Sequence, residues 1–304
     1  MFLPLGDDLD RRNLPIVPTF LILANVLVYV YQVRIGIEAG ADDPILGQRA
    51  IIAFWKQFGL IPTELMEGEV MGLLSHMFMH GDFFHILGNM IVLWAFACSL
   101  ESGLGAATLL GLYLFWGVAS GGCHAYMNLE SDMPLVGASG AISGLMGAYL
   151  VAYGPQANIK CLVYIAVRPF VARIPAMAFC GFWIMGQMWE ASNDPNGISG
   201  IAWYAHLGGF AVGVVTMFLL RNDMENNLVR DKSGNLVFAE NSESVAAKEQ
   251  QKLAAVQASG ASSLPEDCPY CGTAISEELI INPMMARCAN EDCEHLIYPQ
   301  QLVC

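Results

Sequence analysis

Charged residues are scarce in this sequence. Asp, Glu, Lys and Arg make up 14% of its 304 residues, whereas soluble globular proteins carry about 25%. This shortage excludes an ordinary cytosolic enzyme, and the 55% share of hydrophobic residues excludes a chain that is disordered over most of its length. The composition indicates a protein with several membrane spans, since each helical span takes about 20 residues.

Lysine and arginine are the scarcest of the charged residues. The sequence has 14 Lys and Arg against 28 Asp and Glu, a formal net charge of −14, which opposes nucleic-acid binding by bulk charge. The first ten residues contain three aspartates and no basic residue, so they lack the basic segment of a secretory signal. Because no organelle-targeting feature is visible either, we expect an integral protein of a bacterial cytoplasmic membrane.

Uncharged apolar runs are abundant, and six of them predict membrane spans. They cover residues 14–33, 83–100, 104–126, 134–153, 174–189 and 201–220. The fifth run is the shortest. A further apolar stretch at 161–167 is too short to cross a bilayer. We therefore expect an all-α membrane protein in which the segment 1–221 forms a bundle of six transmembrane helices.

The positions of Lys and Arg predict how these spans are oriented, because cytoplasmic loops carry an excess of both. Basic residues precede the first run, separate the fourth from the fifth and follow the sixth: Arg11, Arg12, Lys160, Arg168, Arg173 and Arg221. The loops after the third and fifth runs contain none. Both chain ends are therefore expected in the cytoplasm. The first loop, 36–69, then lies outside, and parts of it look like either an interfacial segment or a partly buried loop.

Polar residues occur inside the apolar runs, where an ionisable group costs about 2.5–3.5 kcal/mol on insertion scales. His80, His85 and Asn89 lie at the start of the second run, Ser139 at the start of the fourth and His206 at the start of the sixth. With both ends inside, these three runs all cross from outside to inside. Each residue alone has a simple structural explanation, such as helix packing or interfacial anchoring, but their shared depth near the outer face favours a joint function.

The residue types in this set suit acyl transfer. Ser139 is a weak nucleophile that needs a base, and His206 can take its proton and pass it to the leaving amine. No Asp or Glu lies in the fourth or sixth run near the outer face, which favours a Ser–His dyad over a triad. The backbone N–H of Ser139 and the side chains of Asn89 and His85 can donate to the oxyanion. Glycine repeats at 140–144 and 209–213 predict close packing of the fourth and sixth runs.

These segments resemble the motifs of the rhomboid intramembrane serine proteases. The matching stretches are HGDFFHILGN at 80–89, GASG at 137–140 and AHLGGFAVG at 205–213, and the resemblance covers residues 10–221. It implies a serine endopeptidase that cleaves transmembrane helices of single- or multi-span membrane proteins near the outer face, without a cofactor.

The resemblance also implies roles for the polar residues. Ser139 would be the nucleophile and His206 the base, with His85, Asn89 and the Ser139 amide as oxyanion hole and His80 in support. Some family members have a Tyr one helical turn after the nucleophile that stacks on the catalytic His. This chain has Ser143 there, which leaves open what holds His206 in place.

Beyond Arg221 the sequence becomes polar, and we expect a linker over 222–265 and a small cytoplasmic domain over 266–304. This last segment contains a CxxC pair and a looser CxxxxC pair, formed by Cys268, Cys271, Cys288 and Cys293. Four thiolates suit a tetrahedral Zn²⁺, and a domain this small needs such a metal to fold. The pattern predicts a zinc ribbon. A disulfide pair or a ribbon without metal is the alternative, and His295 could replace one ligand.

Other functions are left open by the sequence. A catalytically silent rhomboid-like membrane protein that binds transmembrane segments is the main alternative, although the presence of Ser139, His206 and Asn89 opposes it. A transporter would need polar residues across the whole bilayer, whereas these gather near one face. The ribbon could dock a cytoplasmic protein, recruit a substrate or stabilise the end of the domain.

Overall fold

The chain forms two compact units, Met1–Ala239 and Glu240–Cys304. The computed structural model describes residues 2–9, 14–165, 168–194 and 202–225, together with short strands at 228–230, 236–238, 280–282, 285–287 and 296–297. In the second unit the described residues are β6 (Ile280–Asn282), β7 (Met285–Arg287) and β8 (Leu296–Ile297), which pair as an antiparallel sheet. The four cysteines of the predicted zinc site lie outside the described residues.

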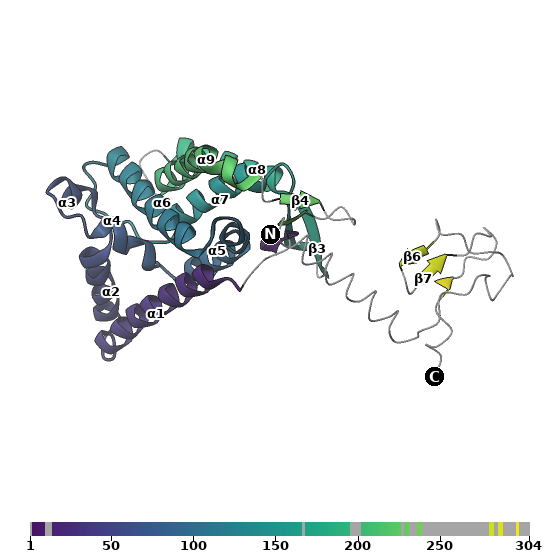
Figure 1. Ribbon diagram of the computed structural model, residues 1–304. Helices are drawn as coiled ribbons and strands as arrows, with labels where there is room; N and C mark the ends of the chain where they lie inside the picture. The colour runs from purple at the N-terminus through teal and green to yellow at the C-terminus, as the bar shows by residue number, and fades with distance from the viewer. Residues whose placement is uncertain are drawn as a thin grey trace. The chain divides into compact units, whose positions relative to one another are not determined.

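Six helices that coincide with the apolar runs, called the six long helices below, make up most of the described part of the first unit (Figure 1). They are α1 (Ile16–Ala39), α5 (Phe83–Leu104), α6 (Ala106–Met127), α7 (Ser139–Tyr153), α8 (Ala176–Asn193) and α9 (Trp203–Glu225). Each of them overlaps one of the six apolar runs. Four are long and apolar enough to cross a membrane, namely α1, α5, α6 and the Trp203–Leu220 part of α9, while α7 is a shorter apolar helix.

Helix α7 is the centre of this bundle. All of its residues from Gly140 to Tyr149 are buried, and it packs against α9 and α6. The fourth apolar run begins at residue 134, but the helix begins only at Ser139. Gly137 explains the difference, since its φ of 129° is a conformation that side chains with a Cβ rarely adopt.

Glycines let α7 and α9 approach closely, as the sequence repeats predict. A Cβ atom on Gly213 would meet the backbone oxygen of Gly144, and one on Gly209 would meet the backbone oxygen of Gly140. The obstacle in both cases is backbone, which cannot move aside as a flexible side chain can. This contact brings the N-terminal halves of α7 and α9 together.

We expect Gly213→Ala to destabilise the bundle by about 1–3 kcal/mol, because the added methyl group overpacks the α7–α9 contact. Thermal unfolding in detergent measures the loss. Gly111→Ala on α6 is the matched control, since a Cβ there meets no described atom within 4 Å, and Ala is the better helix former. Equal melting temperatures for the two variants would contradict the packing role of Gly213.

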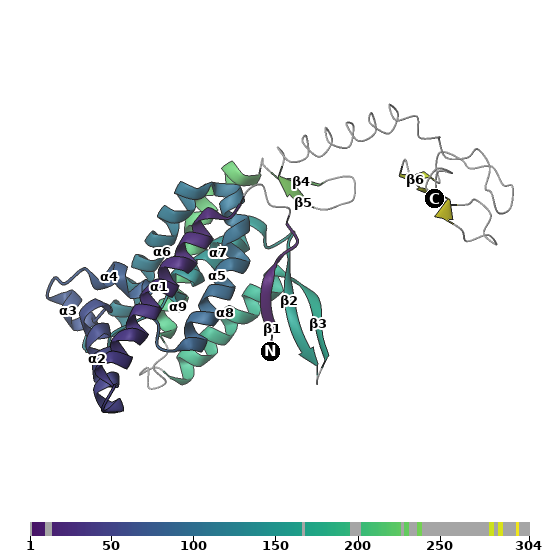
Figure 2. The ribbon, with the colours of Figure 1, turned by 90° about the horizontal axis from the view of Figure 1, so that it is seen from below.

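A three-stranded antiparallel sheet corrects the all-α expectation. Its strands are β1 (Phe2–Asp7), β2 (Asn158–Ile165) and β3 (Arg168–Pro175), in the order β1-β2-β3. Figure 2 shows them side by side at the flank of the helices. The apolar stretch at 161–167, which is too short to cross a membrane, thus contributes to a strand. The sequence of that strand does not identify β1 as one of its two partners, because β1 lies at the start of the chain and four long helices come between them.

Buried polar contacts attach this sheet to the bundle. The carboxylate of Asp7 is buried and accepts hydrogen bonds from Tyr149 Oη on α7 (2.7 Å) and from the backbone N–H of Leu9 (3.3 Å). The carboxylate of Asp8 accepts from the backbone N–H and the Nδ2 of Asn158, both at 2.8 Å. The first residues of the chain are thereby fixed to α7 and to β2.

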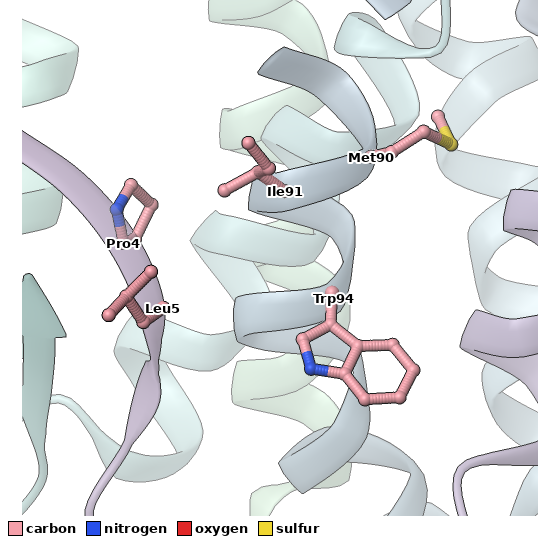
Figure 3. A pocket seen from close by; sticks show the side chains of 5 residues that line it. All are labelled: Pro4, Leu5, Met90, Ile91 and Trp94. Carbon is pink, nitrogen blue, oxygen red and sulfur yellow. The ribbon is translucent and has the colours of Figure 1, made fainter. Parts of the chain in front are cut away.

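The sheet also borders an apolar pocket. Figure 3 shows this pocket between β1 and α5, lined by Pro4, Leu5, Met90, Ile91 and Trp94. Its lining has no acid, base or nucleophile, so we do not take it for a reaction site.

The segment between α1 and α5 contains α2 (Pro44–Phe58), α3 (Pro62–Met66), α4 (Gly72–Ser75) and the 3₁₀ turn His76–Phe78. A short relay ties it to α1. Trp55 Nε1 donates to Gln32 Oε1 at 3.0 Å, and Gln32 Nε2 donates to the backbone oxygen of His80 at 2.7 Å. Asp82 then caps α5 by accepting from the N–H groups of Phe84 and His85 (2.8 and 3.0 Å). These bonds fix the backbone at the start of α5.

Candidate active site

Ser139 and His206 meet where α7 and α9 begin. Ser139 is the first residue of α7, and His206 lies in the first turn of α9. Ser139 Oγ and His206 Nε2 are 2.8 Å apart, a hydrogen-bond distance between a hydroxyl and an imidazole. The glycine contact between the two helices holds this pair together although 67 residues separate them in the chain. A nucleophile and a base in this relation are the minimum for acyl transfer.

His85 approaches the same point from α5. A Cβ atom on Gly137 would lie 2.9 Å from His85 Nε2 and 3.7 Å from Ser139 Oγ, so both side chains lie beside Gly137, and glycine there leaves room for the imidazole. The backbone N–H of Gly81 donates to His85 Nδ1 at 3.3 Å. With Nδ1 accepting, the neutral ring carries its proton on Nε2.

Asn89 lies one helical turn after His85, on the same face of α5. Its side chain is buried, and its Nδ2 has no hydrogen-bond partner among the residues that the structure describes. An unpaired buried donor costs about 1–3 kcal/mol. Because this donor has no partner, it is available to hydrogen-bond an oxyanion.

His80 is packed behind His85. Its ring is fully buried, and the two ring centroids are 5.1 Å apart in an edge-to-face arrangement. Neither ring nitrogen of His80 has a hydrogen-bond partner within the described part of the chain. Burial, and then the neighbouring His85, lower the pKa of His80 to about 3, so its imidazole is neutral. His80 is therefore placed to hold the His85 ring in position by packing against it.

The second nitrogen of His206 has a partner that was not predicted from the sequence. His206 Nδ1 lies 2.6 Å from Oε1 of Gln187 on α8. A third catalytic member was sought as an Asp or Glu in the fourth and sixth runs, whereas this side chain is an amide on the fifth. A signal was present, because Gln187 is the only side-chain amide between residues 174 and 189.

Aromatic rings surround the His206 imidazole. The ring of Trp183 on α8 is tilted at 43° to it with centroids 6.0 Å apart, and Trp203 meets it edge-on at 6.2 Å. Ser143 does not take the place of a stacking Tyr, since its Oγ donates to the backbone oxygen of Ser139 at 2.6 Å. The rings of α8 and α9 therefore flank the imidazole.

The site at the starts of α5, α7 and α9 is built from a serine, imidazoles, an amide and backbone N–H groups. Such groups can attack a carbonyl, move a proton and stabilise an oxyanion. The described residues contain no group of three or more His, Cys, Asp or Glu side chains that could hold a metal ion.

Comparison with known proteins identifies relatives. A family model described as a rhomboid domain matches residues 67–223. A mitochondrial rhomboid protein of Saccharomyces cerevisiae is 26% identical over 181 residues, which cover 58% of this chain and 49% of the relative. A rhomboid-like protein of Arabidopsis thaliana is 33% identical over 118 residues, or 38% of each chain.

A bacterial relative is also found. A Bacillus subtilis protein, named as a candidate rhomboid protease, is 40% identical over 83 residues, or 27% of this chain and 41% of the relative. In these three relatives the matched region is about half of the relative's length or less.

Proposed function

The chain belongs to the rhomboid family, and on that premise we propose that it is an intramembrane serine endopeptidase with Ser139 as nucleophile and His206 as base. Proteins of this family are integral to the membrane, act on membrane-protein substrates within the bilayer and need no cofactor for catalysis. The observation that carries the proposal is the 2.8 Å separation between Ser139 Oγ and His206 Nε2. The substrates would be transmembrane helices of single- or multi-span proteins.

The reaction proceeds in two halves. Ser139 Oγ attacks the scissile carbonyl carbon while its proton moves to His206 Nε2. The backbone N–H of Ser139, Asn89 Nδ2 and His85 Nε2 donate to the resulting oxyanion. The intermediate then collapses, the C–N bond breaks, and His206 gives its proton to the leaving amine. Water, deprotonated by His206, hydrolyses the acyl-enzyme and restores Ser139.

We further propose that all six long helices cross the membrane, with both chain ends in the cytoplasm and the reaction near the outer face. The support is the distribution of Lys and Arg, which favours an outside location for the starts of α5, α7 and α9. A bacterial cytoplasmic membrane is the proposed location; the relatives include bacterial and mitochondrial proteins.

The experiment that tests the proposed function uses the wild-type protein in membranes with a single-span reporter substrate. We expect the reporter to be cut near the outer end of its helix. A fluorophosphonate should label the same samples, and peptide mapping should place the label on Ser139. If the folded protein neither cuts nor takes the label, the protease proposal is wrong and the silent binder of transmembrane segments becomes the better explanation.

We also propose that Cys268, Cys271, Cys288 and Cys293 hold a structural Zn²⁺ that stabilises the second unit. Its support is the spacing of the cysteines. This zinc has a separate structural task, because the proposed reaction uses no metal. We also propose that this unit binds a cytoplasmic protein partner.

We expect the purified protein to contain about one zinc per chain. Cys271→Ser should lower that content, measured by elemental analysis, because three thiolates bind the metal less tightly than four. Reporter cleavage should be unchanged. Cys304→Ser serves as the control and should keep the metal. Loss of cleavage in Cys271→Ser, with the helices still folded, would show that the two units do not work independently.

A further inference from the structure

We propose that Gln187 positions the catalytic base: its side-chain oxygen accepts the Nδ1 proton of His206 and so keeps Nε2 free to take the proton of Ser139. This inference rests on the proposed protease function. Gln187 is a positioning residue, since its contact is with His206 and not with the reacting atoms. It supplies what Ser143 does not, a side chain that holds His206.

The His206 ring makes two hydrogen bonds. Nε2 is 2.8 Å from Ser139 Oγ, and Nδ1 is 2.6 Å from Gln187 Oε1. A neutral imidazole has one N–H and one bare nitrogen. For Ser139 to donate its proton, Nε2 must be the bare nitrogen, and Nδ1 must then carry the hydrogen. That hydrogen needs an acceptor, and the Gln187 oxygen is in place to be one.

The opposite tautomer would stop the reaction. With the hydrogen on Nε2, the imidazole could only donate to Ser139 Oγ, and the hydroxyl proton would have no base to receive it. A Gln187 amide with its oxygen and nitrogen exchanged would present its NH₂ group to Nδ1 and favour that unproductive form. The orientation of this amide therefore decides whether His206 can act as a base, and an experiment that reads the tautomer tests it directly.

An amide suits this place better than a carboxylate would. The titratable groups that act on His206 from the neighbouring helices are His85 on α5 and His124 on α6, which are imidazoles. A carboxylate between membrane-embedded helices would carry a large desolvation cost. Gln187 supplies an acceptor oxygen without a charge, which is consistent with the absence of an Asp or Glu among the hydrogen-bond partners described for His206.

The position of Gln187 also makes α8 part of the catalytic arrangement. Trp183 lies one helical turn before it, and both side chains meet the His206 ring. The other face of α8 is exposed, as at Phe182, Met185 and Trp189. Although α8 carries neither the nucleophile nor the base, two of its side chains thus contact the ring of the base.

The test compares Gln187→Leu, which removes the acceptor, with Gln187→Glu, which replaces it with a charged one. Met188→Leu is the control, because Met188 is the next residue along α8 and its side chain is exposed. The first readout is the ¹⁵N NMR spectrum of histidine-labelled full-length protein in detergent, with His206 assigned by its loss in His206→Ala. The second is reporter cleavage and fluorophosphonate labelling across a pH series.

We expect the wild-type spectrum to show the Nδ1–H tautomer of His206 and the Gln187→Leu spectrum to show a mixture. In the same variant kcat and the labelling rate should fall by up to about 100-fold, with little change in KM, since a misplaced catalytic group costs about that much. In Gln187→Glu the carboxylate favours the protonated imidazole, so the acidic limb of the pH profile should move upward by about 1–3 pH units.

Two outcomes would overturn the inference while the protease function stands. One is an active wild type whose His206 carries its hydrogen on Nε2. The other is a pair of Gln187 variants whose kcat and pH profile match those of Met188→Leu. A wild type that is inactive, but whose His206 tautomer and titration respond to both substitutions, would instead keep the contact and reject the proposed function.

Discussion

Replacing Ser139 with Ala is expected to abolish reporter cleavage. The methyl group offers no nucleophile to the scissile carbonyl, and loss of the nucleophile in a serine protease lowers kcat by about 10⁶-fold. Fluorophosphonate labelling should vanish with it. The fold should persist, because Ser139 Oγ has His206 Nε2 as its hydrogen-bond partner among the described residues and the backbone contacts of α7 are unchanged.

The matched control is Ser99→Ala on α5. Ser99 is also a buried serine, and its Oγ has no hydrogen-bond partner in the described part of the chain. This variant should cut and label as the wild type does, with an unchanged melting temperature. Substantial cleavage by the Ser139→Ala variant would mean that another group attacks the substrate. The assignment of Ser139 and His206 as the catalytic pair would then be wrong.

Asn89→Leu is expected to give the second largest loss, of about 10²–10³-fold in kcat, because an oxyanion-hole donor contributes about 2.7–4 kcal/mol of transition-state stabilisation. Its effect on substrate binding should be small. The protein should not become less stable. The Asn89 Nδ2 group lacks a partner among the described residues, so leucine removes a buried donor whose desolvation is uncompensated.

The measurements are kcat and KM for the reporter and the melting temperature of the same preparation. Asn25→Leu on α1 is the control, since Asn25 is another buried amide with one unpaired atom among the described residues, its Oδ1. It should retain full kcat. If Asn89→Leu loses activity only in proportion to a drop in melting temperature, the amide has a structural task and the oxyanion hole must be built without it.

The candidate site was more predictable from the sequence than the fold around it. Polar groups in a bilayer are costly, so His85, Asn89, Ser139 and His206 stand out against their apolar neighbours in the sequence. The charge bias of the loops predicts one depth for them. The sequence also predicts that Ser139 and His206 lie close together, because the glycine repeats of α7 and α9 indicate a closely packed helix pair. Gln187 was missed because the third catalytic member was sought as a carboxylate in the fourth and sixth runs, whereas this residue is an amide in the fifth.

The sheet could not be predicted in the same way. A short apolar stretch such as 161–167 does not distinguish a strand from a buried helix segment by its pattern alone. Strand β2 pairs on one side with β3, the next strand along the chain, and on the other side with β1. The pairing with β1 runs from Phe2 opposite Val163 to Asp7 opposite Ile159, and no local pattern indicates it because the two strands are far apart in the sequence. The fifth apolar run begins at residue 174, but α8 begins only at Ala176, because residues 168–175 form β3.

The pairing of β1 with β2 also imposes an order on the biogenesis of this protein. Residues 2–7 leave the ribosome early. Their strand partner, residues 158–165, is synthesised much later. At a synthesis rate of about 5–20 residues per second, β1 waits roughly 8–30 seconds without its partner. In that interval α1, α5, α6 and α7 are synthesised. The segment that is synthesised first is therefore among the last to complete its pairing. A chain arrested before residue 158 would leave β1 without β2.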